Sequence, residues 1–257
     1  MPSDIGWSGL VASLVLVGVA VGLSLVRSLG LERSIVWASA RALVQLLLVG
    51  VALEFVLDRN LAWSWAWVVV MILFAADTVR RRARDVGDVF LLALVAFAAA
   101  AVVSLLVLFG LEVFPLEPRT LIPMAGLMVG NSMSATVLVA RRVLEELRDK
   151  RDEVEARLAL GLTARDAARP YVRNAVRTAL IPQIETTKAV GLVFLPGAMT
   201  GLILAGVDPL DAVRVQVAVM YLVLGSVATT VTVVALGVQR RLFTGDHRLV
   251  VPSRPAG

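Results

Sequence analysis

Residues 89–111, VFLLALVAFAAAAVVSLLVLFGL, contain no charged side chain and decide the class of fold. A helix needs about 20 apolar residues to cross the hydrocarbon core of a bilayer, and this stretch supplies them. Unpaired backbone polar groups are too costly in lipid, so an apolar run of this length predicts a transmembrane helix.

Six further stretches have a similar character, so about seven transmembrane helices are expected. The predicted spans are residues 5–26, 35–57, 61–76, 89–111, 120–140, 189–207 and 215–238. The composition agrees, because 58% of the 257 residues are hydrophobic and 18% are charged, against roughly 45–50% and 25% in soluble domains. We predict an all-α, multi-pass integral protein of the cell membrane, with residues 1–257 forming a single transmembrane domain.

The basic residues predict the orientation, because Lys and Arg concentrate in cytoplasmic connections. Most of the 25 Lys and Arg residues follow the first, third, fifth and seventh spans, whereas Arg59, Arg119 and Arg214 lie on the other side. The N-terminus is therefore expected outside, and residues 239–257 are expected to form a cytoplasmic tail. This topology accounts for the net charge of +5, so membrane lipids are expected partners and nucleic acid is not.

Residue types that carry out catalysis are scarce. The chain has no cysteine, one histidine (His247) and no Gly-Lys pair, which excludes a thiol catalyst and a Walker A loop. We expect no enzyme activity, no ATPase site and no cofactor within this chain, and the sequence leaves a metal site unknown.

The longest connection, residues 141–188, is predicted to be cytoplasmic and helical. Its first half reads as an extension of the fifth span, with oppositely charged residues at i,i+4 spacing such as Arg151 and Glu155. Gly161 is a suitable residue to end that helix.

The second half of this connection holds further helix starts. Thr163 and Asp166 resemble a capping box, and Pro170 is suited to the first position of another helix. Arginines recur every four residues from 165 to 177. This series fits contact with anionic lipid headgroups and also docking to a cytosolic partner.

Polar and small residues within the spans are candidates for a translocation pathway. Arg41 and Gln45 share one face of a helix, and a charge inside a membrane is a functional candidate by default. Arg41 and Glu54 also lie near enough to helix ends to reach the interface, and small residues in the fifth and sixth spans could serve helix packing. The candidate pathway residues are Arg41, Gln45, Asn131, Ser132, Met133, Pro196, Met199 and Thr200.

Residues 155–163, EARLALGLT, resemble the coupling motif of ABC transporter permeases, with Arg157 in place of the motif's second alanine. In that motif a helix of the membrane subunit sits in a groove of a separate ATP-binding subunit. The resemblance implies that this subunit contacts Glu155, Ala156, Leu160, Gly161, Thr163, Arg165 and Asp166.

A second resemblance covers almost the whole chain. The stretches RALVQL (41–46), GNSM (130–133), ALIP (179–182) and LPGAMTG (195–201) are similar to the Fet iron-export permease family, which includes plant aluminium-tolerance permeases. The resemblance implies a permease subunit of an ABC transporter, present as a homodimer, that exports a metal or another small solute. A cytosolic partner subunit would bind the ATP and Mg²⁺.

The residues themselves do not identify the cargo. Iron prefers oxygen or imidazole ligands, whereas thioethers favour softer ions, and the predicted spans have no histidine and no carboxylate near their middle. A chelate, another metal or an organic solute fits equally well. The alternative function is a self-sufficient carrier or channel driven by an ion gradient, which normally needs titratable groups deep in the bundle.

Overall fold

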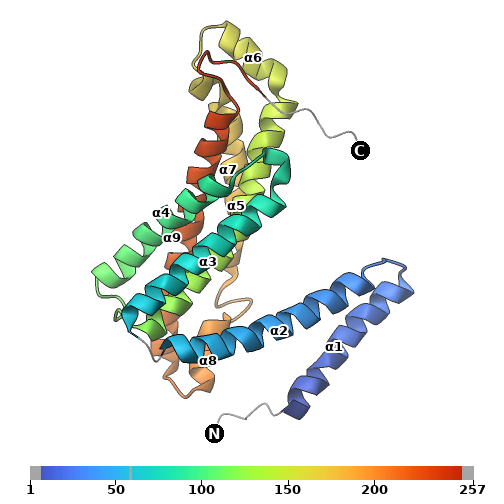
Figure 1. Cartoon of the computed structure of the whole chain (residues 1–257), viewed down its shortest axis with the longest axis vertical. Helices are drawn as coiled ribbons and strands as arrows, with labels where there is room; N and C mark the ends of the chain where they lie inside the picture. Colours follow the sequence, from blue (N-terminus) through green and yellow to red (C-terminus); the bar gives the residue numbers. More distant parts are fainter. Residues whose placement is uncertain (1–6, 58–59, 251–257) are drawn as a thin grey trace. The chain divides into compact units, whose positions relative to one another are not determined.

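The computed structural model describes residues 7–57 and 60–250, and the expected all-helical class holds throughout these residues (Figure 1). The elements are α1 (Trp7–Val26), α2 (Glu32–Leu57), α3 (Leu61–Arg82), the 3₁₀ helix η1 (Arg84–Val86), α4 (Phe90–Gly110), α5 (Pro118–Asp149), α6 (Arg151–Ala159), α7 (Ala164–Ala189), α8 (Gly197–Leu204) and α9 (Pro209–Arg241). The chain divides into two units, and the second begins at Leu61.

The first unit is a hairpin of α1 and α2. The Ser24 hydroxyl closes its turn, because it donates to Glu32 Oε1 at 2.6 Å and accepts from the Leu31 N–H at 3.2 Å. Large apolar side chains point outward along both helices, and none of the most apolar stretch of α2 is buried within this chain. Such a surface suits lipid or another protein surface and does not suit water.

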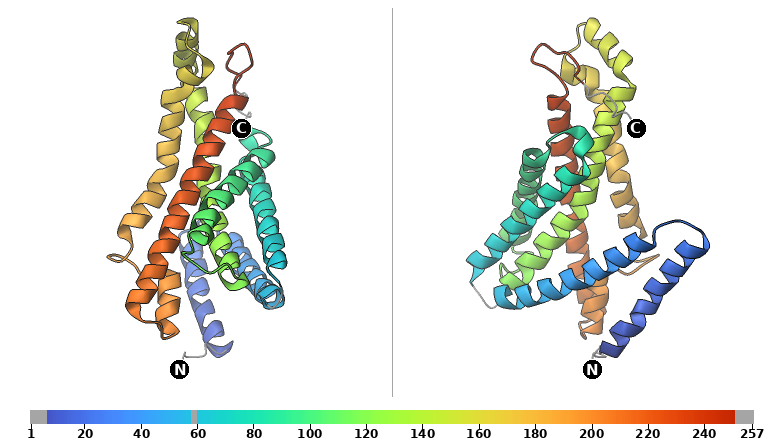
Figure 2. Two further views of the ribbon diagram at one scale, coloured as in Figure 1. Left: turned by 90° about the vertical axis from the view of Figure 1, so that its left-hand side faces the viewer. Right: turned by 45° about the vertical axis from the view of Figure 1, so that its right-hand side comes forward.

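The second unit is a bundle in which α5 and α9 pack side by side at the centre (Figure 2). Helices α3 and α7 pack on α5, and α4 packs on α9. Alanine and valine dominate the buried surfaces, and the small alanine side chain lets helix backbones approach closely in a membrane. One polar contact crosses the centre, where the buried Ser132 hydroxyl donates to Ser226 Oγ at 3.3 Å.

Five helices among the described residues are long and apolar enough to cross a membrane, namely α2, α3, α4, α5 and α9. Helix α1 adds a shorter apolar segment, Val11–Val26, so the described residues do not confirm the predicted count of seven. The third span was predicted too short, because α3 continues to Arg82. Arg80, Arg81 and Arg82 occupy its last turn, where cations interact favourably with the helix dipole.

The sixth predicted span, residues 189–207, is not a single helix. Helix α7 runs into its start, α8 occupies only its second half, and residues 190–196 between them are not helical. Gly191 adopts a positive φ of 84°, and the ring nitrogen of Pro196 carries no N–H for a helical hydrogen bond. Hydropathy therefore predicted a continuous span, whereas the structure leaves the helical conformation at residues 190–196.

The connection between α5 and α7 also differs from expectation. The predicted extension of the fifth span breaks at Lys150, so that α6 is a separate helix. Pro170 does not start a helix but lies within α7, which also contains Pro182. The predicted Arg151–Glu155 ion pair is present at 2.6 Å.

The C-terminal segment after α9 turns back on itself. Val250 N–H donates to the Leu242 carbonyl at 2.8 Å, and an isolated bridge joins Phe243 to Leu249. This folded part of the predicted tail, residues 242–250, is called the return segment below. Residues 251–257 of that tail, and residues 5 and 6 of the first predicted span, lie outside the described residues.

Candidate functional site

The turn between α6 and α7 is closed by local hydrogen bonds. Gly161 has a positive φ of 87°, and the N–H groups of Gly161 and Leu162 donate to the carbonyls of Leu158 and Arg157 at 2.9 and 3.2 Å. This pattern is the Schellman closure, in which glycine takes the left-handed position at no steric cost. A helix therefore ends at Gly161 as predicted, with the glycine in the left-handed conformation.

Thr163 starts α7 in the manner that the sequence predicts. Its Oγ1 accepts from the Asp166 N–H at 3.2 Å and donates to Asp166 Oδ2 at 2.7 Å. A capping side chain of this kind satisfies an otherwise unpaired N–H group in the first turn of a helix. The turn therefore has a defined geometry before any partner binds.

The structure brings the seven predicted coupling residues together on this turn, and all seven are exposed. Leu160 is 81% exposed beside Gly161. An exposed leucine in a stretch otherwise rich in charged side chains is suited to contact with a partner surface. These residues, 155–166, are called the coupling turn below.

Helix α6 is held against α7 by a polar cluster. Glu153 accepts hydrogen bonds from Lys150 Nζ and from the Tyr171 hydroxyl, each at 2.8 Å, and the Arg157 guanidinium lies 5.6 Å from the Tyr171 ring centre. The hydrogen bonds from Lys150 and Tyr171 lower the pKa of Glu153. Burial, followed by the contact with Glu153, raises the pKa of Tyr171.

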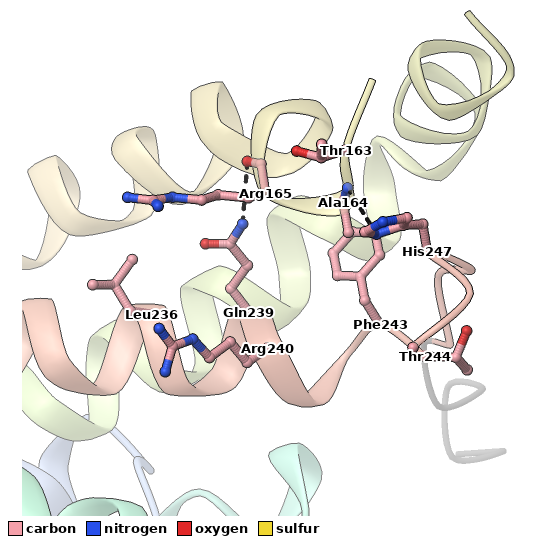
Figure 3. Close-up of a pocket in the computed structure, with 10 residues that line it drawn as sticks. Thr163, Ala164, Arg165, Leu236, Gln239, Arg240, Phe243, Thr244 and His247 are labelled. Carbon is pink, nitrogen blue, oxygen red and sulfur yellow. Dashed lines mark hydrogen bonds between the residues drawn. The ribbon is translucent and has the colours of Figure 1, made fainter. Parts of the chain in front are cut away.

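The return segment and the last turns of α9 supply contacts to the coupling turn that sequence analysis missed. The Ala164 N–H donates to His247 Nδ1 at 3.4 Å, and Gln239 Nε2 donates to the Arg165 carbonyl at 3.3 Å. Figure 3 shows both bonds at the edge of a pocket of about 470 Å³, into which Phe243 also projects. No local pattern around His247 indicated this contact, because it joins segments about 80 residues apart.

A second pocket, of about 300 Å³, lies between α5, α7, α9 and the segment that precedes α8. It brings together two predicted pathway residues, Asn131 and Pro196. Its other polar side chains are Gln183, Thr186, Thr187 and Gln216. It is called the Gln216 pocket below.

The remaining pathway candidates lie elsewhere. Ser132 is directed into the α5–α9 interface, Met133 packs against the core, and Met199 and Thr200 lie on α8 outside the lining of the Gln216 pocket. Arg41 and Gln45 are exposed on α2 in the first unit.

Gln216 is a residue that sequence analysis missed. It is only 7% exposed, and its Oε1 has no hydrogen-bond partner. The amide within the run VRVQVAV could have marked Gln216 as a candidate functional residue, because polar groups inside membrane helices are costly and commonly functional. Across the described residues, no group of three or more His, Cys, Asp or Glu side chains could hold a metal ion.

With several membrane-length helices, an exposed polar turn and a polar pocket between helices, the chain is a multi-pass membrane protein. It belongs to the Uncharacterised protein family (UPF0014), whose model matches residues 7–243.

Three relatives extend over most of the chain. UPF0014 membrane protein STAR2 of Oryza sativa subsp. japonica is 38% identical over 93% of this chain and 84% of its own length. Probable iron export permease protein FetB of Escherichia coli (strain K12) is 32% identical over 94% of each chain. Protein ALUMINUM SENSITIVE 3 of Arabidopsis thaliana is 36% identical over 84% of this chain and 79% of its own length. No solved structure matches the chain. The predicted family resemblance is confirmed, and the relative with a functional name is a permease rather than an enzyme.

Proposed function

We propose that this chain is the membrane subunit of an ABC transporter that exports iron or another small solute. The observation that carries the proposal is the coupling turn, whose residues are exposed, locally ordered and similar to the coupling motif of ABC permeases. A separate cytosolic subunit would bind ATP and Mg²⁺ and dock on this turn. The relative named as an iron export permease supports this function and the direction of transport.

Helix α7 provides a direct mechanical connection for such a transporter. Its first turn carries Arg165 and Asp166, and its last turns carry Gln183 and Thr187 of the Gln216 pocket. The helix has 26 residues, a length of about 39 Å at 1.5 Å per residue. A displacement of the coupling turn would therefore be transmitted to the Gln216 pocket through one packed helix.

Reconstitution tests the proposal. The chain is placed in liposomes with and without a candidate ATP-binding subunit, and movement of radioactive iron is followed. We expect transport only when this subunit and MgATP are both present. Transport that follows an imposed proton gradient in the absence of the ATP-binding subunit would instead establish the alternative, an ion-gradient-driven carrier.

We further propose that the permease subunits form a homodimer. In a membrane, irregular backbone is tolerated where protein covers it or where it lines a cavity. Residues 190–196 are not helical, and Leu192 and Val193 are 92% and 80% exposed. A second copy of the chain would supply the missing cover over this segment, which is called the break segment below.

The absence of cysteine from the chain makes the dimer simple to test. Leu192→Cys is expected to form a disulfide-linked dimer when membranes are treated with a mild oxidant, because symmetry brings equal residues together near a twofold axis. Val102→Cys, on the exposed face of α4, is the matched control and should remain monomeric on a denaturing gel. Equal cross-linking of both variants would indicate random collision and would contradict this interface.

A further inference from the structure

We infer that the Gln216 pocket binds a ligand through O–H groups that donate hydrogen bonds, with Gln216 as the principal acceptor. The O–H groups belong either to an organic hydroxyl compound or to the water shell of a metal ion. The inference rests on the proposed function, in that the bound ligand is the transported solute, and it adds a binding site and a ligand class.

The environment of Gln216 is the first line of argument. The side chain is 93% buried by the exposure given above, lines the pocket, and leaves Oε1 without a partner. A buried acceptor without a hydrogen bond costs about 1–3 kcal/mol. Buried polar groups in proteins nearly always have a partner. The oxygen itself is shielded from solvent, so the Gln216 amide turns about its last side-chain bond to meet a partner that enters the pocket from outside the chain.

Two threonines add acceptors to the pocket, beside the amide N–H donors of Gln183 and Gln216. The hydroxyls of Thr186 and Thr187 donate to the carbonyls of Pro182 and Gln183, at 2.9 and 2.8 Å, within α7 itself. A hydroxyl has one donor and two acceptor lone pairs. With their hydrogens used on the helix backbone, both threonine oxygens can only accept from a ligand.

Asn131, on α5, likewise uses a side-chain donor on the backbone of its own helix. Its Nδ2 donates to the Leu127 carbonyl at 2.7 Å, which leaves the side-chain oxygen as a further acceptor. The pocket thus offers oxygen acceptors from three helices, and a ligand with several O–H groups could bridge them. A ligand that only accepts hydrogen bonds would leave Gln216 Oε1 unpaired.

Direct coordination of a bare metal ion is disfavoured by the same lining. The lining residues include no carboxylate and no imidazole, and these are the groups that hold iron in proteins. The nearest charges along α7 are Glu185 and Lys188, which neutralise each other in an exposed ion pair of 2.8 Å. A metal would therefore enter with its own oxygen ligands, as a hydrated ion or within a chelate that still carries bound water.

The test measures binding to the purified full chain in lipid nanodiscs without the ATP-binding subunit. The probes are radioactive ferrous iron alone, ferric citrate and sorbitol, each followed by equilibrium dialysis. At least one probe is expected to bind the unmodified chain. Gln216→Leu is expected to weaken that binding about tenfold, the equivalent of one lost hydrogen bond of about 1.4 kcal/mol.

The control variants separate binding from folding. Gln216→Leu should retain or raise thermal stability, because it replaces an unsatisfied buried amide by an apolar group of similar size. Gln216→Glu keeps an acceptor oxygen and should bind the probe. Thr187→Val should weaken binding, whereas Thr232→Val should not, since Thr232 makes the same kind of backbone bond, to Ala228 at 2.8 Å, outside the pocket.

Each outcome has a defined meaning. Loss of sorbitol binding in Gln216→Leu identifies an organic hydroxyl ligand, and loss of ferrous iron or ferric citrate binding identifies a metal carried with its oxygen ligands. Failure of all three probes to bind the unmodified chain, or unchanged binding by Gln216→Leu, overturns the inference. ATP-dependent transport is measured separately, so intact transport by Gln216→Leu would reject this site while leaving the proposed function standing.

Discussion

Gly161→Val is expected to reduce ATP-dependent transport strongly while the membrane subunit still inserts and folds. At a φ of 87°, a β-branched residue is strained by about 1–3 kcal/mol, so the coupling turn should change its conformation and lose its fit to the ATP-binding subunit. Transport in liposomes should fall by about tenfold or more, the loss expected for one misplaced contact surface. The measurements are transport and ATPase activity of the same preparation.

Gly206→Val is the matched control for Gly161→Val. Gly206 ends α8 with a φ of 88°, and the N–H groups of Gly206 and Val207 bond to Ile203 and Leu202 as in the Gly161 closure. The local strain is therefore the same, but the site lies outside the coupling turn. If both variants lose ATPase stimulation equally, or if Gly161→Val transports normally, the assignment of the coupling turn is wrong.

Ser132→Leu is expected to lower the free energy of unfolding by about 1–3 kcal/mol, the usual cost of overpacking. Ser132 is fully buried where α5 meets α9, and its hydroxyl donates to Ser226 Oγ at 3.3 Å. A leucine would force these two central helices apart. The measurement is the unfolding midpoint in detergent, followed by the fluorescence of the five tryptophans.

Ser134→Leu provides the comparison for Ser132→Leu. Ser134 lies two residues further along α5 and is exposed, so the same substitution there adds a lipid-facing side chain and should leave the midpoint nearly unchanged. Equal destabilisation by the two substitutions would mean that the central α5–α9 contact does not limit stability.

The parts of the structure that depend on nearby residues could be predicted from the sequence. The long helices follow from apolar runs such as residues 89–111, since membrane insertion depends mainly on hydropathy. The cap of α7 by Thr163 and the closure at Gly161 also involve only neighbouring residues. This is why sequence reading located the coupling turn.

The parts that depend on distant residues could not be predicted in this way. The break segment at 190–196 is as apolar as a helix would be, and hydropathy does not report backbone conformation. The Gln216 pocket combines Asn131, Thr187 and Gln216 from three helices, and their proximity follows from packing alone. The contact between Ala164 and His247 has the same origin.

The return segment has a practical consequence for handling the protein. Residues 242–250 fold back so that His247 meets the first residue of α7, and Leu249 shares a pocket lining with Glu155 and Gly161. A fusion attached directly after Val250 would therefore start beside the coupling turn. A bulky affinity tag or fluorescent protein placed there would occupy space needed by a docking subunit. Labels placed at the N-terminal hairpin, or removable C-terminal tags, are therefore the better choice for preparing an intact complex.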